Sequence, residues 1–215
     1  MKINTIICGD SLTELKKLPD ESIDLLLTDP PYNAKNIGPN ERVYTKGVMQ
    51  LPQKEYEKFC KDWITEGLRV AKRIAFTPGI SNICFYPQPL WVLCWHKPAA
   101  VSFNRMGGFN AWEPIFVYGK MQKGKRLGQD YLLFNTLNFT KGPEKDHPCP
   151  KPLQLIKLLV DKFSNEGEIV LDPFCGSGTT CVAAKQLGRK YIGIDINDDY
   201  IKITKQRLRQ ETLFL

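Results

Sequence analysis

The sequence predicts an α/β fold built on a mostly parallel β-sheet, and three observations support this prediction. Short apolar runs alternate along the chain with segments whose apolar residues recur at helical spacing. This alternation is typical of layered α/β proteins. Four of the apolar runs end in an aspartate. A glycine-rich stretch joins one of these runs to a helical segment, as in α/β sheets that bind nucleotides.

The four runs that end in an acid are predicted to be neighbouring parallel strands. They are 5–9 before Asp10, 25–28 before Asp29, 168–171 before Asp172 and 191–194 before Asp195. Ligands of open α/β sheets bind outside the carboxyl ends of the strands. We therefore expect four carboxylates at one edge of the sheet, in a site that handles hydrogen-bond donors or positive charge.

The other elements follow from periodicity and from helix-end signals. Further strands are predicted at 74–77, 90–95 and 114–118, and Trp91 and Trp95 are interpreted as core residues. Helices are predicted at 54–72, from 153 onward, at 179–187 and at 198–208. Gly188 is a typical residue for ending a helix, and Asn197 or Asp198 can cap the last helix.

Composition excludes several classes of protein. The chain has 215 residues, of which 42% are hydrophobic, and this size suits one domain spanning 1–215. Its seven cysteines form no Cys-x-x-Cys pair, so we expect neither a disulfide framework nor a metal site, and a cytoplasmic location. No apolar run reaches the length of a membrane span. The net charge of +7 favours a polyanionic partner.

Two stretches are predicted to lack regular structure. Residues 33–51 contain several glycines and prolines and are interpreted as a long, mobile loop. Residues 120–150 are rich in lysine, glycine and proline and are interpreted as loop or irregular structure. Loops of this length in a compact domain are often functional.

The segment Asp29-Pro30-Pro31-Tyr32 is the strongest chemical signal. A carboxylate at the end of a buried strand is costly unless it has a partner or a function. The two prolines stiffen the backbone and carry no N–H group, so we expect their carbonyls to remain free as acceptors. A carboxylate, a fixed carbonyl and an aromatic face can together hold a planar group that carries an NH2.

The glycine-rich stretch Asp172-Pro173-Phe174-Cys175-Gly176-Ser177-Gly178-Thr179 predicts a cofactor loop. Asp195 lies 195 − 176 = 19 positions after Gly176, about the spacing at which an acid holds ribose hydroxyls. Cys181 stands where a dinucleotide loop has its third glycine, and no phosphate-binding lysine follows the loop. An adenosine cofactor without phosphates, such as S-adenosylmethionine, fits these departures. Cys175 and Cys181 are interpreted as small packing residues.

These motifs resemble those of the DNA amino-methyltransferases that modify adenine N6 or cytosine N4. Asp29-Pro30-Pro31-Tyr32 precedes the glycine loop, which is similar to the permuted, β-type order in that family. Segment 147–152 resembles the element before the family's glycine loop, except that Cys149 replaces the usual Thr. Segment 112–120 resembles its last core strand, and Gly9-Asp10 its acidic contact to the cofactor adenine.

The resemblance implies a Rossmann-like S-adenosylmethionine-dependent methyltransferase fold. Its sheet has seven strands, one of them antiparallel, with helices on both faces and a circularly permuted motif order. It also implies site residues. The amine would be held by Asp29, Pro30, Pro31 and Tyr32. The cofactor would be held by Asp10, Asp29, Lys151, Asp172, Pro173, Phe174, Gly176, Ser177, Gly178, Thr179 and Asp195.

The implied activity is methyl transfer to adenine N6 in DNA, by base flipping and direct displacement. Asp at position 29 favours adenine, and cytosine N4 is the alternative. A non-catalytic DNA-binding subunit with the same fold is a remoter alternative. The resemblance further implies a bacterial or phage enzyme of the restriction–modification kind, compatible with a homodimer. A small target-recognition region is expected at about 120–146, with phosphate contacts from Lys120, Lys123, Lys125 and Arg126.

Overall fold

The computed structural model describes residues 1–33, 49, 51–97, 106–121, 128–134 and 151–210, and the statements below concern these residues. Its strands are β1 (Thr5–Cys8), β2 (Leu25–Thr28), β3 (Arg73–Phe76), β4 (Trp91–His96), β5 (Trp112–Gly119), β6 (Tyr131–Leu133), β7 (Ile169–Asp172) and β8 (Lys190–Asp195). Its helices are α1 (Ser11–Lys16), α2 (Gln53–Val70), the 3-10 helix η2 (Ile80–Phe85), α3 (Leu153–Phe163), α4 (Thr179–Gln186) and α5 (Asp198–Gln210).

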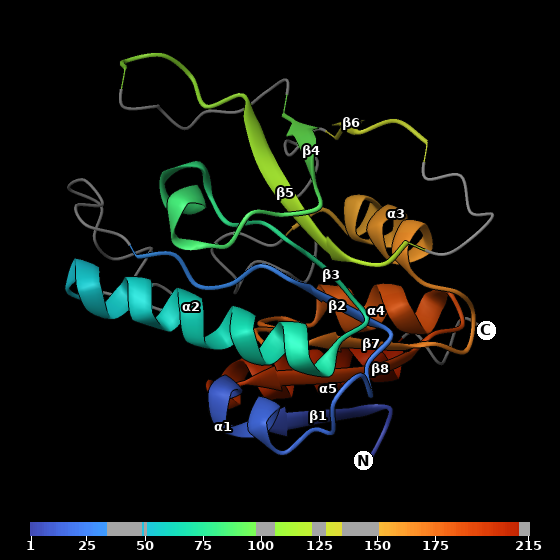
Figure 1. Cartoon of the computed structure of the whole chain (residues 1–215). Helices are drawn as coiled ribbons and strands as arrows, with labels where there is room; N and C mark the ends of the chain where they lie inside the picture. The colour runs from blue at the N-terminus through green and yellow to red at the C-terminus, as the bar shows by residue number, and fades with distance from the viewer. Residues whose placement is uncertain (34–48, 50, 98–105, 122–127, 135–150, 211–215) are drawn as a thin grey trace.

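The strands form one twisted sheet with the order β1-β8-β7-β2-β3-β5-β4-β6 (Figure 1). The pairs β1–β8, β8–β7, β7–β2 and β2–β3 are parallel, whereas β5 is antiparallel to both of its neighbours. The predicted α/β sheet with a single antiparallel strand is thereby confirmed. The sheet has one strand more than expected, because β6 pairs with the end of β4 inside the stretch that we expected to be irregular.

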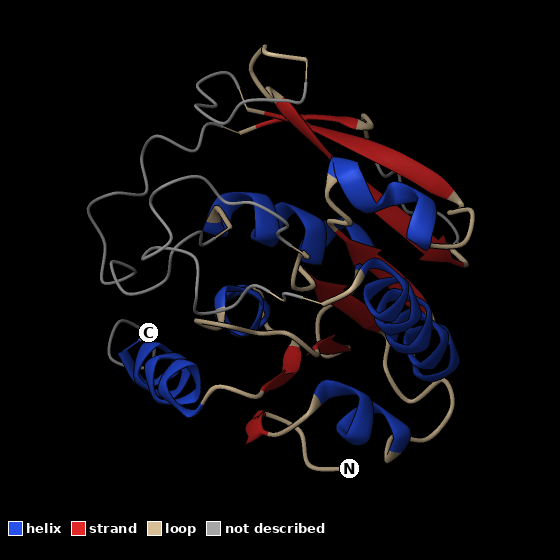
Figure 2. Cartoon of the chain, turned by 90° about the vertical axis from the view of Figure 1, so that its left-hand side faces the viewer, coloured by secondary structure: helices blue, strands red, loops and turns tan. Residues whose placement is uncertain are grey.

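Alternation along the central strands explains why the sheet is covered on both faces. In β2, Leu26 faces the core cluster formed with α1 and α2, whereas Leu25 and Leu27 face the cluster formed with α3 and α4. All three side chains are at most 2% exposed. Side chains of a strand point alternately to opposite faces, so a continuous apolar run is what a doubly covered strand needs. Figure 2 shows the helices on either side of the strands.

The helices agree with the predictions except at two short elements. The periodicity correctly indicated α2, α3, α4 and α5, and the Asn197 side chain accepts the Asp199 N–H (2.9 Å) at the start of α5. The sequence reading missed α1 and η2, which have six residues each. So short a segment is too brief to display a helical repeat.

Trp95 is 2% exposed, as predicted for a core residue, but Trp91 is 59% exposed. The interpretation of Trp91 as core was wrong because strand β6 pairs only with Cys94–His96 of β4. The first half of β4 therefore lacks a neighbour on that side among the described residues. There the Trp91 indole N–H donates to Asp130 (3.2 Å).

None of the described helices combines the length and the apolar character needed to cross a membrane.

Candidate functional site

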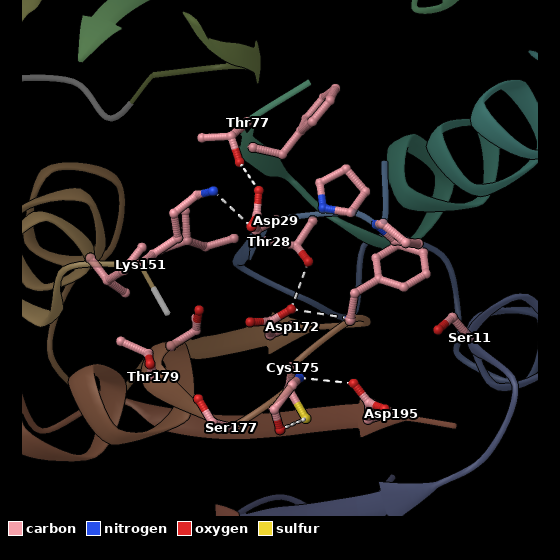
Figure 3. Close-up of a pocket in the computed structure, with 18 of the residues that line it drawn as sticks. Ser11, Thr28, Asp29, Thr77, Lys151, Asp172, Cys175, Ser177, Thr179 and Asp195 are labelled. Atoms are coloured by element: carbon pink, nitrogen blue, oxygen red, sulfur yellow. Dashed lines mark hydrogen bonds and ion pairs between the residues drawn. The ribbon is translucent and has the colours of Figure 1, made fainter. Parts of the chain in front are cut away.

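A cavity of about 550 Å³ opens at the carboxyl ends of the parallel strands (Figure 3). This volume lies in the range of small-molecule and cofactor sites. The four predicted acids Asp10, Asp29, Asp172 and Asp195 all line it. Its polar lining also includes Ser11, Thr28, Tyr32, Thr77, Glu113, Lys151, Ser177, Thr179, Thr180, Asn197 and Tyr200.

Asp29 follows the last residue of β2, and hydrogen-bond donors surround its carboxylate. Its Oδ1 accepts hydrogen bonds from the hydroxyls of Tyr32 (2.6 Å) and Thr77, and its Oδ2 lies 2.8 Å from Lys151 Nζ. The side chain is 31% exposed. A carboxylate has about four acceptor positions, so Asp29 keeps capacity for a further donor from the cavity.

The two prolines after Asp29 differ in what their carbonyls do. The Pro31 carbonyl accepts the Tyr56 hydroxyl (3.1 Å), so the expectation that both carbonyls stay free was wrong for Pro31. Tyr56 reaches it because α2 packs over this edge of the sheet. Among the residues that the structure describes, no hydrogen bond reaches the Pro30 carbonyl.

Both the hydroxyl and the backbone of Tyr32 make hydrogen bonds. The hydroxyl donates to Asp29 Oδ1 (2.6 Å) and lies 3.2 Å from the Thr77 carbonyl. The backbone carbonyl accepts the Met49 N–H (3.1 Å). The next residue, Asn33, makes two side-chain hydrogen bonds with the Leu51 backbone (2.8 and 2.9 Å). Burial raises the pKa of Tyr32 well above its ordinary value, and the Asp29 charge adds to this. Tyr32 is therefore a neutral donor to Asp29.

Lys151 precedes α3 and brings a positive charge into the cavity wall. Its side chain is 13% exposed and lies 2.8 Å from Asp29 Oδ2 and 3.6 Å from Glu113 Oε2. Its Nζ also lies 5.6 Å from the Tyr32 ring centre and 5.8 Å from that of Trp95, within reach of cation–π attraction. Burial by itself would lower the pKa of Lys151, but the negative neighbours, Asp29 first, raise it well above its ordinary value. Lys151 is therefore charged.

Asp172 ends β7 in the floor of the cavity and is 3% exposed. Its Oδ1 accepts the Thr28 hydroxyl (2.6 Å) and the Phe174 N–H (3.1 Å), as the dashed lines in Figure 3 show. Burial raises the pKa of Asp172 to about 6, although hydrogen bonds from Thr28, Thr180 and Phe174 oppose the rise. The carboxyl group thereby fastens the glycine loop to strand β2.

The glycine loop needs glycine at position 178 for two reasons. Gly178 has φ +82°, and a Cβ there would lie 2.3 Å from the Thr204 methyl carbon. Thr204 packs this closely because its hydroxyl donates to the Gly176 carbonyl (2.8 Å). One side of the loop therefore packs against α5. Its other side faces the cavity, which is lined by Gly176, Ser177 and Thr179.

Asp195 and Asp10 stand at the ends of the adjacent strands β8 and β1. Asp195 accepts the Gly176 N–H (2.9 Å) and the Asn197 N–H (2.8 Å). Burial raises its pKa, against the effect of these backbone hydrogen bonds. Asp10 is exposed and caps α1 by accepting the Thr13 N–H (2.8 Å). Both carboxylates line the cavity and keep unused acceptor positions.

The structure places most of the predicted site residues in this one cavity. Asp10, Asp29, Pro30, Pro31, Tyr32, Lys151, Asp172, Phe174, Gly176, Ser177, Thr179 and Asp195 line it. Pro173 and Gly178 do not. Instead, the Pro173 carbonyl accepts the Ser11 hydroxyl, and Gly178 allows the close packing on Thr204.

Of the four basic residues predicted to contact DNA phosphates, the structure describes only Lys120. Lys120 follows Gly119, which pairs with Arg73 at the start of β3. Because β5 is antiparallel, its carboxyl end lies at the edge opposite the cavity. The structure therefore places Lys120 away from the site, and Lys123, Lys125 and Arg126 lie outside the described residues.

The sequence reading missed the cavity roles of Thr28, Thr77 and Glu113. Thr28 and Thr77 end predicted strands, and Glu113 is the second residue of the segment that resembled the last core strand. A strand-end position was therefore an available signal for Thr28 and Thr77. Glu113 gave no such signal, because it reaches the cavity from the amino end of an antiparallel strand. Among the described residues, no group of His, Cys, Asp and Glu could hold a metal ion.

Comparison with known sequences gives consistent matches. A family described as DNA methylase, of the N6/N4 type, matches residues 88–206. Type II methyltransferase M.HinfI of Haemophilus influenzae is 33% identical, over 97% of this chain and 69% of that protein. DNA adenine methyltransferase YhdJ of Escherichia coli (strain K12) is 32% identical, over 95% of this chain and 82% of that protein.

Solved structures share the fold. The cytosine-N4-specific PvuII DNA methyltransferase superposes with a TM-score of 0.70 at 18% identity, over 96% of this chain and 86% of that chain. The M1.HpyAVI–SAM complex superposes with a TM-score of 0.68 at 24% identity, over 95% of this chain and 98% of that chain. At these identities the likeness establishes the fold alone, which agrees with the sheet order described above.

Proposed function

Because this chain belongs to the N6-adenine/N4-cytosine family of DNA methylases, we propose that it methylates the N6 amino group of adenine in DNA. The methyl donor is S-adenosylmethionine, which the solved structure of M1.HpyAVI holds. The observation that carries the proposal is the position of Asp29, which faces the same cavity as the glycine loop and Asp195. One cavity thus holds an amine acceptor beside a nucleoside site.

The residues present fit this cofactor. The Asp195 carboxylate is the natural acceptor for ribose hydroxyls. Gly176, whose φ is +49° and whose N–H donates to that carboxylate (2.9 Å), lines the same cavity. Asp10 offers a second carboxylate for an amino group of the adenine ring. Phe59 and Phe174 supply apolar and aromatic surface in the lining. When bound, S-adenosylmethionine supplies an electrophilic methyl group on a positively charged sulfur.

Asp29 and its neighbours would prepare the amine. The lone pair of an exocyclic amine is delocalised into the base, so the nitrogen is a poor nucleophile. Hydrogen bonds from its NH2 to the Asp29 carboxylate and the Pro30 carbonyl would localise that pair, and the Tyr32 ring would pack against the base. The target base must leave the duplex to reach the cavity. Acceleration then comes mainly from positioning, and no covalent nucleophile is needed.

Adenine is favoured over cytosine by two observations. Asp29 is the first residue of its motif, and a relative covering most of this chain is named a DNA adenine methyltransferase. The cytosine-N4-specific neighbour has 18% identity and supports the fold only. N4-cytosine methylation remains the second candidate. The homodimer, the cytoplasmic location, and the recognition region at about 120–146 stay predictions. Most of that region lies outside the described residues.

The decisive experiment identifies the product. Unmethylated genomic DNA is incubated with the protein and S-adenosylmethionine labelled in its methyl group, then digested to nucleosides and separated. We expect label in N6-methyl-2′-deoxyadenosine. Label confined to N4-methyl-2′-deoxycytidine would overturn the adenine assignment. If no label enters the DNA and calorimetric titration with S-adenosylmethionine shows no binding, the chain is a non-catalytic subunit.

A further inference from the structure

Two lysines and two carboxylates alternate in one row, and three of the four, Glu113, Lys151 and Asp29, line the cavity. Lys97 forms an ion pair with Glu113, whose Oε2 lies 3.6 Å from Lys151 Nζ, and Lys151 Nζ lies 2.8 Å from Asp29 Oδ2. The side chains of Lys97 and Lys151 are 8% and 13% exposed. With all four groups charged, the row is electrically neutral, which is the condition under which such burial is tolerable.

The antiparallel hairpin of β4 and β5 fixes Glu113 in this row. Glu113 pairs in register with Trp95, and the Lys97 N–H donates to the Ala111 carbonyl (2.7 Å). Both ammonium groups lie over the Trp95 ring, at 5.2 Å for Lys97 and 5.8 Å for Lys151. The Glu113 side chain is thus held by regular backbone pairing, and the proposed function gives it no role.

Hydrogen-bond donors are unevenly shared between the two carboxylates that flank Lys151. The Asp29 carboxylate accepts hydrogen bonds from the hydroxyls of Tyr32 and Thr77 and pairs with the ammonium group of Lys151. Glu113 Oε2 is buried and has no hydrogen-bond partner among the described residues, because 3.6 Å to Lys151 Nζ exceeds hydrogen-bond length. Asp29, which must accept the amine, therefore already has three donors, whereas Oε2 of Glu113 has none.

We propose that Glu113 is a positioning residue for methyl transfer, serving as a second acceptor to which Lys151 moves when the target amine donates to Asp29. The displacement needed is small, under about 1 Å, because a normal N–H···O distance is about 2.9 Å. No proton changes place and the net charge of the row is conserved. This role rests on the proposed function, since it presupposes an amine at Asp29.

The charges around Lys151 agree with this role. The groups that face it are Asp29 at the end of β2, Tyr32 just after it, and Glu113 on β5, with Lys97 behind Glu113. Burial would raise the pKa of Glu113, but the charges of Lys151 and Lys97 bring it below its usual range. Glu113 therefore offers a negative oxygen at neutral pH.

The test is Glu113→Gln, which keeps the size of the side chain and removes its charge. We expect kcat to fall about tenfold, within the range of coupling between neighbouring groups of one network, while the KM for S-adenosylmethionine stays within about threefold. In a Lys151→Met background the same substitution should change kcat by less than about twofold, because its effect acts through Lys151. Equal effects in both backgrounds, or an unchanged kcat in the single variant, would overturn the proposal.

A second readout follows Lys151 directly by NMR titration of its side chain. Glu113→Gln removes a negative neighbour, so the pKa of Lys151 should fall. An unchanged titration would contradict the role of Glu113 even if the wild-type protein methylates no DNA, in which case the proposed function has failed separately. If the single variant does not fold, Lys97→Met combined with Glu113→Gln removes the charge pair together, and the same titration is measured.

Glu168→Gln is the matched control. Glu168 pairs with the buried Arg73 (2.7 Å) at the opposite edge of the sheet, and its exposed side-chain fraction of 23% is similar to the 17% of Glu113. We expect a lower melting temperature for this variant and a kcat within about twofold of wild type, as for a solely structural ion pair.

Discussion

The two ends of strand β2 carry the same side chain in contrasting surroundings. Asp24 lies just before the strand. One of its carboxylate oxygens accepts a hydrogen bond from Lys72 Nζ (2.8 Å), and the other accepts the Ile169 N–H (2.9 Å). Asp29, just after it, has three donors that come from side chains lining a cavity. Asp24 ties strands β2 and β7 together, whereas Asp29 faces open space with acceptor capacity left.

The same contrast holds along the whole sheet. At the amino ends of the strands, carboxylates such as Glu168 form pairs that join elements. At the carboxyl ends, Asp10, Asp29, Asp172 and Asp195 line the cavity. Residue type therefore does not separate structural acids from functional acids in this protein. The edge of the sheet at which an acid lies does separate them, because parallel strands bring all their carboxyl ends to the same edge.

The largest expected difference between the two edges concerns Asp29→Asn and Asp24→Asn. Asp29→Asn should lower kcat by about 10²–10³-fold, since a charged acceptor of the reacting amine is lost, with S-adenosylmethionine affinity within about threefold. Asp24→Asn should leave kcat unchanged and lower the free energy of unfolding by about 1 kcal/mol. Single-turnover methylation and urea unfolding measure the two effects. Similar losses of kcat in both variants would erase the contrast.

Two glycines at opposite edges of the sheet extend the comparison between the edges. Gly178→Ala should destabilise the protein by about 3 kcal/mol, because it adds a left-handed alanine and a clash with the buried Thr204. Gly167→Ala has a similar φ of +79° but meets nothing within 4 Å, so we expect about 1 kcal/mol. Thermal unfolding of both variants gives the comparison. Equal shifts would mean that the packing of the loop on α5 contributes nothing.

The acids Asp172 and Asp24 should affect the pH dependence of stability with opposite signs. Burial raises the pKa of Asp172 to about 6 from 3.8, so the folded state binds the extra proton. Stability should fall as pH rises from about 4 to about 6, by at most about 3 kcal/mol. The pKa of Asp24 is lowered, because Lys72 and the Ile169 N–H outweigh the effect of burial. Its contribution is present above about pH 4 and is lost as pH falls further.

Urea unfolding between pH 3 and pH 7 separates these two contributions. Asp172→Asn should flatten the loss between about pH 4 and 6, and Asp24→Asn should flatten the loss below about pH 4. If Asp172→Asn leaves the pH profile unchanged, the carboxyl group is ionised throughout and the cavity floor is wetter than its burial indicates.

The smallest expected effect is that of Lys120→Gln. Lys120 lies at the edge opposite the cavity, so DNA affinity should change by less than about twofold, with no change in its salt dependence. A lysine that contacts a phosphate would instead reduce the salt slope by about one. Fluorescence anisotropy at several salt concentrations distinguishes the two. A reduced slope would show that DNA reaches both edges of the sheet.

Sequence alone predicted the parts of the site that come from parallel strands. Asp29, Asp172 and Asp195 could be placed together because each ends an apolar run, and the runs share a direction in the sheet. Glu113 could not be placed, because the direction of β5 is a tertiary property. The same reversal explains why Lys120 lies on the far edge. Strand β6 was missed because its three residues are too few to show alternation.

The pairing of the first strand with the last has a consequence for how the protein is made. Strand β1 lies at the edge of the sheet and pairs with β8, at residues 190–195. Synthesis at about 5–20 residues per second leaves β1 without this partner for roughly ten seconds or more. Until then Asp10 and Asp195 cannot meet, so a nascent chain gains the cofactor half of its cavity only after β8 has been synthesised. A polypeptide truncated before β8 would present an unpaired β1 to other chains.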